Sequence, residues 1–136
     1  MSNSAFDEMI VLARAAQENA HAPYSNFQVG ACVRTESGAL YAGCNVENAA
    51  YPQGQCAEAS AIGNMVTAGG HRIVEVVVIG GGERLCTPCG GCRQRLTEFC
   101  DPDTPVHICG NEGLRKTLTV ADLMPFAFVA DNLDKL

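Results

Sequence analysis

The stretch Ile-Val-Glu-Val-Val-Val-Ile at residues 73–79 decides the fold. Its near-continuous run of β-branched residues predicts a central strand that is covered on both faces. Three glycines at 80–82 end this strand. After residue 55 the predicted strands alternate with helices, which is typical of parallel crossover connections. The sequence therefore predicts an α/β protein in which helices pack on both faces of a mixed sheet, a three-layer α/β/α sandwich.

The remaining elements follow from local patterns. Helices are predicted where apolar residues recur at helical spacing or alanine is frequent, at 6–19, 56–68, from about 90 to 99, and at 120–124. Further strands are predicted at 27–35, 40–44 and 106–109, the first two joined as a hairpin. No repeat, low-complexity tract or linker interrupts the chain, so we expect a single domain over residues 1–136.

Composition excludes several classes of protein. The 136 residues include 15 acidic and 9 basic side chains, a net charge of −6, and 47% are hydrophobic. A chain of this size buries a core without disulfides, and its acidic excess gives no surface for phosphate backbones, so we expect no nucleic-acid partner. The sequence has neither an apolar run near the roughly 20 residues that span a bilayer nor a signal-peptide pattern. We expect a cytoplasmic protein without membrane association.

Eight cysteines are unusual for such a chain. Without an export signal, clustered cysteines more often bind metal or take part in chemistry than form disulfides. The motif Pro-Cys-Gly-Gly-Cys at 88–92 is predicted to open a helix, which places two sulfurs within reach of one ion. Cys56 opens another predicted helix and can supply a third ligand. Three ligands leave the fourth position of Zn²⁺ open, as in catalytic sites.

Glu58 follows Cys56 by two residues. A carboxylate beside a metal-activated water is a common partner for moving protons. The order Cys-Ala-Glu, then Pro-Cys-Gly-Gly-Cys, matches the pattern of zinc deaminases, in which cysteines can replace the histidine ligand.

Six pieces in order resemble the cytidine deaminases of the small, homotetrameric, all-cysteine class, and the resemblance spans essentially the whole chain. The pieces are APYS at 22–25, FQVGA at 27–31, GCNVENAAY at 43–51, CAE at 56–58, PCGGCRQ at 88–94 and LMPFAF at 123–128. The resemblance implies the cytidine deaminase-like fold, with a mixed five-stranded sheet.

The same resemblance implies an activity and a cofactor. One Zn²⁺ per chain would be bound by Cys56, Cys89 and Cys92, with a hydroxide as fourth ligand. The hydroxide would attack C4 of cytosine while Glu58 shuttles protons. Cytidine and 2′-deoxycytidine would then give uridine and 2′-deoxyuridine plus ammonia, a reaction of pyrimidine salvage.

Substrate contacts are implied residue by residue. Asn45 and Glu47 resemble the pair that hydrogen-bonds the sugar hydroxyls, and Phe27 resembles the aromatic wall beside the base. The backbone of Ala57 would read the pyrimidine edge. In the family, further residues reach the site of a neighbouring subunit in the tetramer, and their equivalents here are Ala49, Tyr51 and Phe128.

One position departs from the family pattern. Where the all-cysteine class usually has an arginine after the catalytic glutamate, this chain has Ala59. Three thiolates and a hydroxide on Zn²⁺ sum to −2, so backbone amides, helix N-termini or another cation such as Arg93 must compensate the charge.

Alternatives remain open for the metal motif. Cys86 could complete a closed four-cysteine structural site with Cys56, Cys89 and Cys92, which would make the protein a zinc-stabilised binding module. Glu58 could then be an ordinary acid in the first turn of a helix.

Alternatives also remain open for the other residues and for the substrate. The three aromatic residues Phe27, Tyr51 and Phe128 could be packing residues, and Asn45 and Glu47 could cap a turn. A deaminase of a cytosine-containing antibiotic would share the zinc motif, although the pair Asn45 and Glu47 suits an unmodified ribose. A polynucleotide-editing deaminase is disfavoured by the acidic charge.

Overall fold

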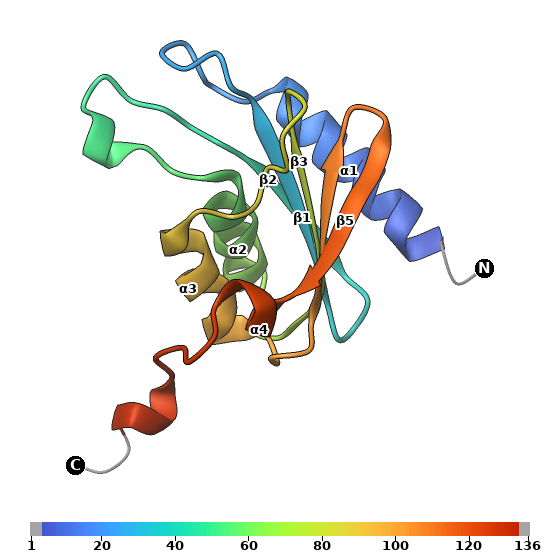
Figure 1. Cartoon of the computed structure of the whole chain (residues 1–136), viewed down its shortest axis with the longest axis vertical. Helices are drawn as coiled ribbons and strands as arrows, with labels where there is room; N and C mark the ends of the chain where they lie inside the picture. Colours follow the sequence, from blue (N-terminus) through green and yellow to red (C-terminus); the bar gives the residue numbers. More distant parts are fainter. Residues whose placement is uncertain (1–3, 134–136) are drawn as a thin grey trace.

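The computed structural model describes residues 4–133. Its five strands form one sheet in the order β2-β1-β3-β4-β5 (Figure 1). The strands are β1 (Val29–Thr35), β2 (Leu40–Cys44), β3 (Ile73–Gly80), β4 (Pro105–Gly110) and β5 (Gly113–Thr119). β3 pairs with β4 in parallel, and the other neighbours are antiparallel. The prediction of a mixed sheet with residues 73–79 at its centre is therefore confirmed.

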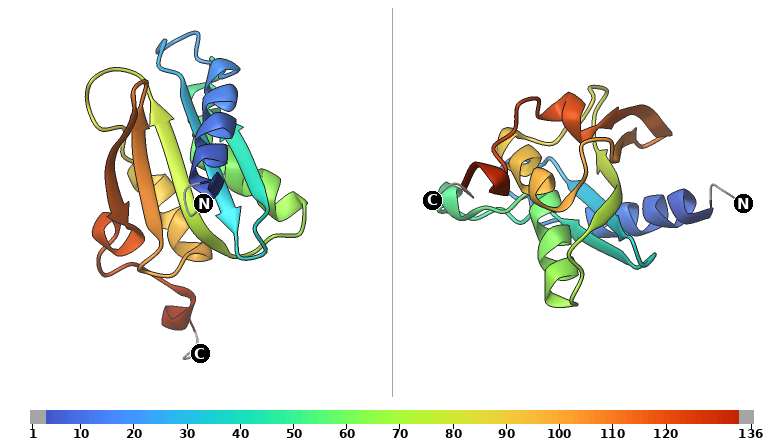
Figure 2. Two further views of the ribbon diagram at one scale, coloured as in Figure 1. Left: turned by 90° about the vertical axis from the view of Figure 1, so that its right-hand side faces the viewer. Right: turned by 90° about the horizontal axis from the view of Figure 1, so that it is seen from below.

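Helices cover both faces of this sheet (Figure 2). One face carries α1 (Ser4–Glu18), and the other carries α2 (Ala57–Thr67) and α3 (Gly90–Phe99), which contact each other. The short α4 (Val120–Leu123) and two 3₁₀ turns, η1 (Tyr51–Gln53) and η2 (Ala130–Leu133), complete the described elements. The three-layer arrangement is confirmed. No helix within residues 4–133 combines the length and apolar character needed to cross a membrane.

The core has two parts because β3 is buried on both faces. Val76 and Val78 contribute to the cluster under α2 and α3, whereas Val77 and Ile79 contribute to the cluster under α1. All four side chains are fully buried. This two-sided burial explains why the sequence of β3 is apolar at almost every position instead of alternating.

Two scattered cysteines serve as small hydrophobic residues beneath α1. Cys32 and Cys109 are fully buried there. Burial raises the pKa of Cys32 to about 12 and that of Cys109 to about 11, so both remain thiols at neutral pH. Across residues 4–133 all eight cysteines are free.

The local sequence patterns did not predict the strand β5 (Gly113–Thr119), although the family resemblance implied a sheet of five strands. β5 is an edge strand that pairs only with β4, and its residues are mostly half-buried or exposed. Arg115 and Lys116 interrupt its apolar pattern, and the register shifts opposite Ile108 and Cys109. An edge strand of this kind leaves little periodicity to detect, because only one side of it is paired and packed.

The first strand also begins later than predicted, at Val29 instead of residue 27. Phe27 consequently lies in the loop before β1, and this loop is tied to the segment that follows β2. His21 N donates to Asn45 O, and Glu47 N donates to His21 O. These bonds bring residues 21–28 and 45–55 together beside the start of α2.

Candidate active site

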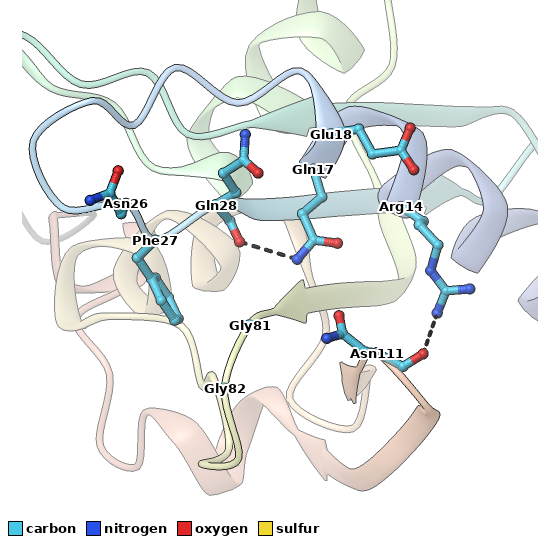
Figure 3. Close-up of a pocket in the computed structure, with 9 residues that line it drawn as sticks. All are labelled: Arg14, Gln17, Glu18, Asn26, Phe27, Gln28, Gly81, Gly82 and Asn111. Carbon is cyan, nitrogen blue, oxygen red and sulfur yellow. Dashed lines mark hydrogen bonds between the residues drawn. The ribbon is translucent and has the colours of Figure 1, made fainter.

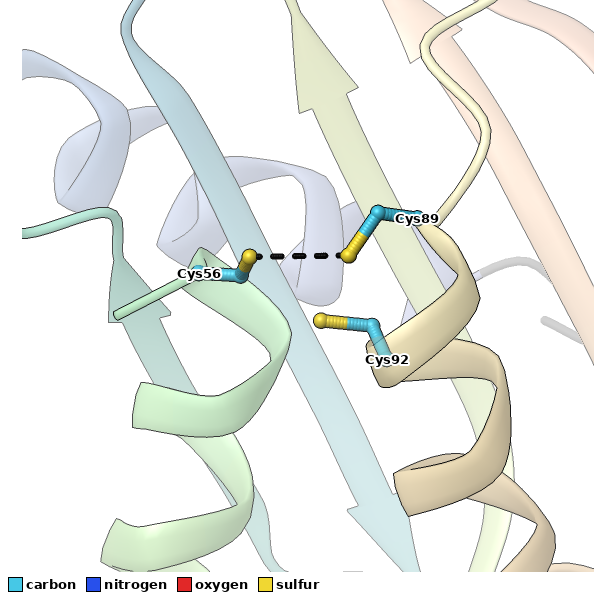
Figure 4. Close-up of side chains that lie close together, drawn as sticks. All are labelled: Cys56, Cys89 and Cys92. Atoms are coloured by element: carbon cyan, nitrogen blue, oxygen red, sulfur yellow. Dashed lines mark hydrogen bonds between the residues drawn. The ribbon is translucent and has the colours of Figure 1, made fainter. Parts of the chain in front are cut away.

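Two helix N-termini bring three sulfurs together. Cys56 is the N-cap of α2, Cys89 is the N-cap of α3, and Cys92 lies in the first turn of α3. The sulfurs all lie within 4.8 Å of one another, and the Sγ atoms of Cys56 and Cys89 are 3.7 Å apart. The three side chains converge from the starts of the two helices (Figure 4). This is the group that the sequence predicts.

The spacing fits a zinc ion. Zn–S bonds of about 2.3 Å in tetrahedral geometry separate two sulfurs by about 3.8 Å, close to the distance between Cys56 and Cys89. Cys92 is fully buried whereas Cys89 is exposed, so the group is closed on one side and open on the other. Three thiolate ligands and one open position are the donor set of a catalytic zinc site.

Cys86 does not belong to this group, as judged over the described residues. Its side chain lies against the backbone of Gly80, where an added Cβ would come within 2.5 Å of the Cys86 sulfur. Burial raises the pKa of Cys86 to about 11. The closed four-cysteine alternative is therefore not supported by the geometry.

The three thiols differ in how readily they ionise. Burial raises the pKa of Cys89, but hydrogen bonds from Cys56 and from the backbone of Cys92 and Gly91 outweigh burial, so this pKa lies below its usual value. Burial is also the largest influence on Cys56 and Cys92, and it raises the pKa of both. Cys89 is thus the first thiolate to form, and a bound cation would stabilise the other two.

Glu58 lies in the first turn of α2 and is only 5% exposed. Burial raises its pKa, and the smaller opposing effects of its own backbone, Cys92 and Arg95 do not reverse that. The ion pairs found in residues 4–133 do not include Glu58. An ordinary first-turn acid would be exposed and stabilised as an anion. A buried carboxyl group with a raised pKa suits proton transfer near neutral pH.

A cavity of about 290 Å³ opens above Glu58 and the sulfurs. It is lined by seven of the predicted site residues, which come from four parts of the chain. These residues are Phe27, Asn45, Glu47, Cys56, Ala57, Glu58 and Cys89. The residues predicted to contact the base, to contact the sugar and to transfer protons thus line one cavity. The sequence motifs imply such a cavity but do not show where in the fold it lies.

Asn45 and Glu47 hold the loop that carries Phe27. Asn45 Nδ2 donates to Phe27 O, and Asn45 Oδ1 accepts from Val29 N, both at 2.8 Å. Glu47 accepts from the hydroxyl and the backbone N–H of Ser25 and from Tyr24 N. The Ser25 hydroxyl is the main reason that the pKa of Glu47 lies below its usual range. Both side chains therefore brace a turn and line the cavity at the same time.

Two hydroxyl side chains that line the cavity, those of Ser25 and Thr87, were not predicted to belong to the site. Ser25 Oγ also accepts from Phe27 N at 3.0 Å, so it links Glu47 to the aromatic wall. Each lies inside or beside a recognised motif, at 22–25 and 88–94, but a single hydroxyl has no spacing signal that would mark it.

Ala49, Tyr51 and Phe128 are not brought to this cavity within one chain. Tyr51 is 75% exposed and meets Tyr24 edge to face at 5.9 Å between ring centroids. Phe128 is 58% exposed, and its carbonyl accepts from Gln94 Nε2 at 2.9 Å. The exposure of both rings contradicts the alternative that they are core residues.

Arg93 does not compensate charge at the sulfurs through contact. Its guanidinium donates to Pro88 O at 2.7 Å, to Leu123 O at 3.0 Å and to Thr87 Oγ1 at 3.3 Å. Arg93 therefore fixes the approach to α3, as a structural residue. Ala59, half-buried on α2, supplies no cation. The sulfur group lies at two helix N-termini, where the backbone of Cys92 and Gly91 hydrogen-bonds Cys89, and Arg95 acts through its charge on Glu58.

A larger hollow of about 590 Å³ shares Phe27 with the cavity above Glu58 (Figure 3). Two of its polar side chains are used within the fold, since Arg14 donates to Asn111 O and Gln17 donates to Gln28 O. The hollow contains neither a sulfur nor a buried carboxylate. Size alone therefore does not locate the chemistry in this protein.

Fold and site together define a class, the α/β/α proteins that hold a metal between two helix N-termini. Residues 4–108 match the family described as the cytidine and deoxycytidylate deaminase zinc-binding region. The chain belongs to this family. It is 39% identical over 127 residues to a cytidine deaminase of Sporosarcina psychrophila, covering 93% of each chain.

Solved structures give the same result. The chain is similar to a crystal structure of cytidine deaminase from Burkholderia pseudomallei, with 39% identity and a TM-score of 0.84, covering 90% of this chain and 98% of the other. It is also similar to the cytidine deaminase of Mycobacterium leprae, with 39% identity and a TM-score of 0.76, covering 88% and 97%. The predicted five-stranded, deaminase-like fold is confirmed.

Proposed function

We propose that the chain catalyses the hydrolytic deamination of cytidine and 2′-deoxycytidine to uridine and 2′-deoxyuridine, with release of ammonia. The observation that carries the proposal is a buried carboxyl group, Glu58, beside a three-thiol zinc group on the floor of a cavity. That cavity also holds the residues whose family equivalents contact base and sugar. Membership in the deaminase family supports this reaction over other zinc hydrolyses.

Cys56, Cys89 and Cys92 would hold the zinc ion. The chemistry that zinc supplies there is Lewis-acid activation of a water molecule for addition to C4 of cytosine. Glu58 takes a proton from this water and delivers it to N3 of the ring. It then takes the remaining proton of the same water and passes it to the departing amine, so that one water is consumed and one ammonia is released. The burial of Glu58 supports this role, because a raised pKa lets one carboxyl group both accept and donate.

The cavity wall would orient the nucleoside. Phe27 packs beside the base, the backbone of Ala57 hydrogen-bonds the pyrimidine edge, and Asn45 with Glu47 hydrogen-bonds the sugar hydroxyls. The lowered pKa of Glu47 keeps it an acceptor over the physiological range. Because the side chains of Asn45 and Glu47 also brace the loop that carries Phe27, the substrate would meet a wall that is already ordered.

We further propose that the 136 residues act as one domain in a cytoplasmic homotetramer, in which Ala49, Tyr51 and Phe128 complete a neighbour's site. The exposure of Tyr51 and Phe128 outside their own chain's cavity supports this assignment. The partner is a small nucleoside and not a nucleic acid, in keeping with the net charge of −6.

The test is the ultraviolet absorbance of cytidine incubated with zinc-replete protein. We expect the cytosine band to be replaced by that of uracil, and no change with Glu58→Ala. Glu98→Ala is the matched control, because Glu98 is exposed on α3 and outside the cavity. Protein with one zinc per chain that leaves cytidine unchanged contradicts the proposal. Conversion only of cytosine within a single-stranded oligonucleotide would favour a polynucleotide deaminase instead.

A further inference from the structure

The loop at residues 81–88 leads to Cys89, one of the three thiols that would bind zinc. Side-chain contacts, and not backbone hydrogen bonds, hold this loop in place. It joins the end of β3 to Cys89 without helix, strand or hydrogen-bonded turn. None of the backbone–backbone hydrogen bonds found outside helices and strands in residues 4–133 involves residues 81–88. Two arginines supply the missing contacts. Arg93 binds the end of the loop, as described above, and Arg115 of β5 binds its beginning.

Arg115 reaches the loop from the edge strand. Its Nη2 donates to Gly82 O at 2.8 Å, and its Nη1 donates to Arg84 O at 3.0 Å. One planar guanidinium thus bridges two carbonyls that are two residues apart, which a lysine ammonium on a flexible stem does less well.

Neighbouring residues hold this guanidinium in place. Glu112 accepts from Arg115 Nε at 2.7 Å and from Nη2 at 3.0 Å, and this pair lowers the pKa of Glu112 to about 2. Gly110 provides the space, because a Cβ there would lie 2.1 Å from the central carbon of the guanidinium. The Arg115 side chain is only 16% exposed as a result. Three residues of the β4–β5 hairpin, Gly110, Glu112 and Arg115, thus hold the beginning of the loop, and we refer to them as the clamp.

We propose that Arg115 is a positioning residue for the active site, which fixes the loop and so sets how Cys89 meets the other two sulfurs. Cys86 and Thr87, later in the same loop, line the substrate cavity. By holding the backbone of residues 81–88, the clamp would influence both the position of Cys89 and the part of the cavity wall formed by Cys86 and Thr87. This inference rests on the proposed function for the role of the cavity, but its test does not require turnover.

The first experiment measures the rate at which a chelator removes zinc from the holoprotein. We expect Arg115→Met to release zinc about tenfold faster, at the lower end of the effect of residues that orient metal ligands. Arg115→Lys should restore part of the difference. Gly110→Ala should act in the same direction as Arg115→Met, since it displaces the guanidinium without removing its charge. Arg72→Met is the control, because Arg72 pairs with Asp101 at the opposite end of β3.

The second readout is limited trypsin cleavage at the Arg84–Leu85 bond, which lies in the exposed part of the loop. We expect faster cleavage there in Arg115→Met and Gly110→Ala than in Arg72→Met, together with a rise in KM for cytidine. Zinc release and loop cleavage that match the parent in both variants would overturn the inference. If the parent protein binds zinc but leaves cytidine unchanged, the proposed function fails while the clamp is still tested by release and cleavage.

Discussion

The two faces of the sheet each hold a cluster of ionisable groups, and the clusters differ in how their charges are matched. On the α1 face, Arg34 Nε and Nη2 donate to Glu75 at 3.0 and 2.8 Å, and the other Glu75 oxygen lies 2.7 Å from His107 Nε2. His107 Nδ1 meets Thr117 Oγ1 at 2.9 Å, so the chain of contacts crosses four strands. On the α2/α3 face, Glu58 is buried beside three thiols and has no ion pair among the described residues.

The difference separates structural from chemical roles. Each group in the Glu75 network has a partner, so removing one member costs stability without affecting a substrate. Glu58 and the sulfurs form no ion pair among the described residues, and the charge of Arg95 offsets only part of the effect of burial on Glu58. Such an arrangement is costly unless a metal and a substrate use it. Ionisable groups on the two faces should therefore respond differently to the same kind of substitution.

The largest contrast is expected in turnover. Glu58→Gln should lower kcat for cytidine by about 10³-fold, within the range for loss of a general acid–base group. Zinc content should stay at the level of the parent protein. Glu75→Gln, the matched change on the other face, should leave kcat within about twofold. Steady-state kinetics with zinc analysis of the same samples checks this, and equal losses in the two variants would remove the distinction between the faces.

The next largest contrast is expected in zinc binding by variants of two buried cysteines, Cys92 and Cys109. Cys92→Ser should weaken zinc binding by more than the ~100-fold that residues around a metal site can contribute. Cys109→Ser, an equally buried position on the α1 face, should keep one zinc per chain. The measurement is zinc competition with a chromogenic chelator. Loss of zinc in the Cys109 variant would show that the sulfur group is not the sole determinant of binding.

Stability should report the network on the α1 face. Glu75→Gln should lower the free energy of unfolding by about 1–3 kcal/mol, because Arg34 and His107 lose a charged hydrogen-bond partner. Urea unfolding of the zinc-free proteins measures the change without interference from metal binding. If the variant is as stable as its parent, the hydrogen bonds of Glu75 contribute little to the free energy of unfolding.

The smallest effect expected is a pH dependence at Glu58. Burial raises the pKa of Glu58 in the folded protein. Between the usual carboxyl pKa and that raised value, the folded chain holds a proton that the unfolded chain has released, so the free energy of unfolding falls as pH rises. Glutamine cannot ionise. Zinc-free Glu58→Gln should therefore be more stable than the zinc-free parent at pH 7, and the difference should shrink toward pH 4.

Urea unfolding from pH 4 to pH 8 provides the measurement. A difference that grows toward acid pH would contradict the sign and would indicate that the Glu58 carboxylate is stabilised in the folded chain.

The sequence predicted features that depend on strong local patterns. The apolar run of β3 and the cysteine spacing around Cys89 and Cys92 were sufficient to place a central strand and a metal group. The edge strand β5 was missed because its pattern is weak and its partner lies across a turn. Arg115 was missed because nothing in its local sequence indicates two carbonyls more than thirty residues earlier in the chain.

The roles of the cavity residues were predicted only in part. Resemblance to a family predicted that Asn45 and Glu47 hydrogen-bond a sugar, but it did not predict that both brace the loop of Phe27. Those hydrogen bonds join residues that are distant in the sequence: Asn45 and Phe27 are 18 positions apart, and Glu47 and Ser25 are 22 positions apart. Such contacts arise from tertiary packing and carry no periodicity in the sequence.

The separation of Cys56 and Cys89 has a consequence for how the protein forms. These residues are 33 positions apart and stand on opposite sides of β3 in the chain. Closing such a loop in an unfolded chain costs about 3 kcal/mol in entropy, so zinc binds more tightly once folding has brought the sulfurs together. The three sulfurs lie together when α2, β3 and α3 are packed as a unit. We expect the rate of tight zinc uptake by refolding chains to follow the assembly of that unit, so metal uptake would report when these three elements pack.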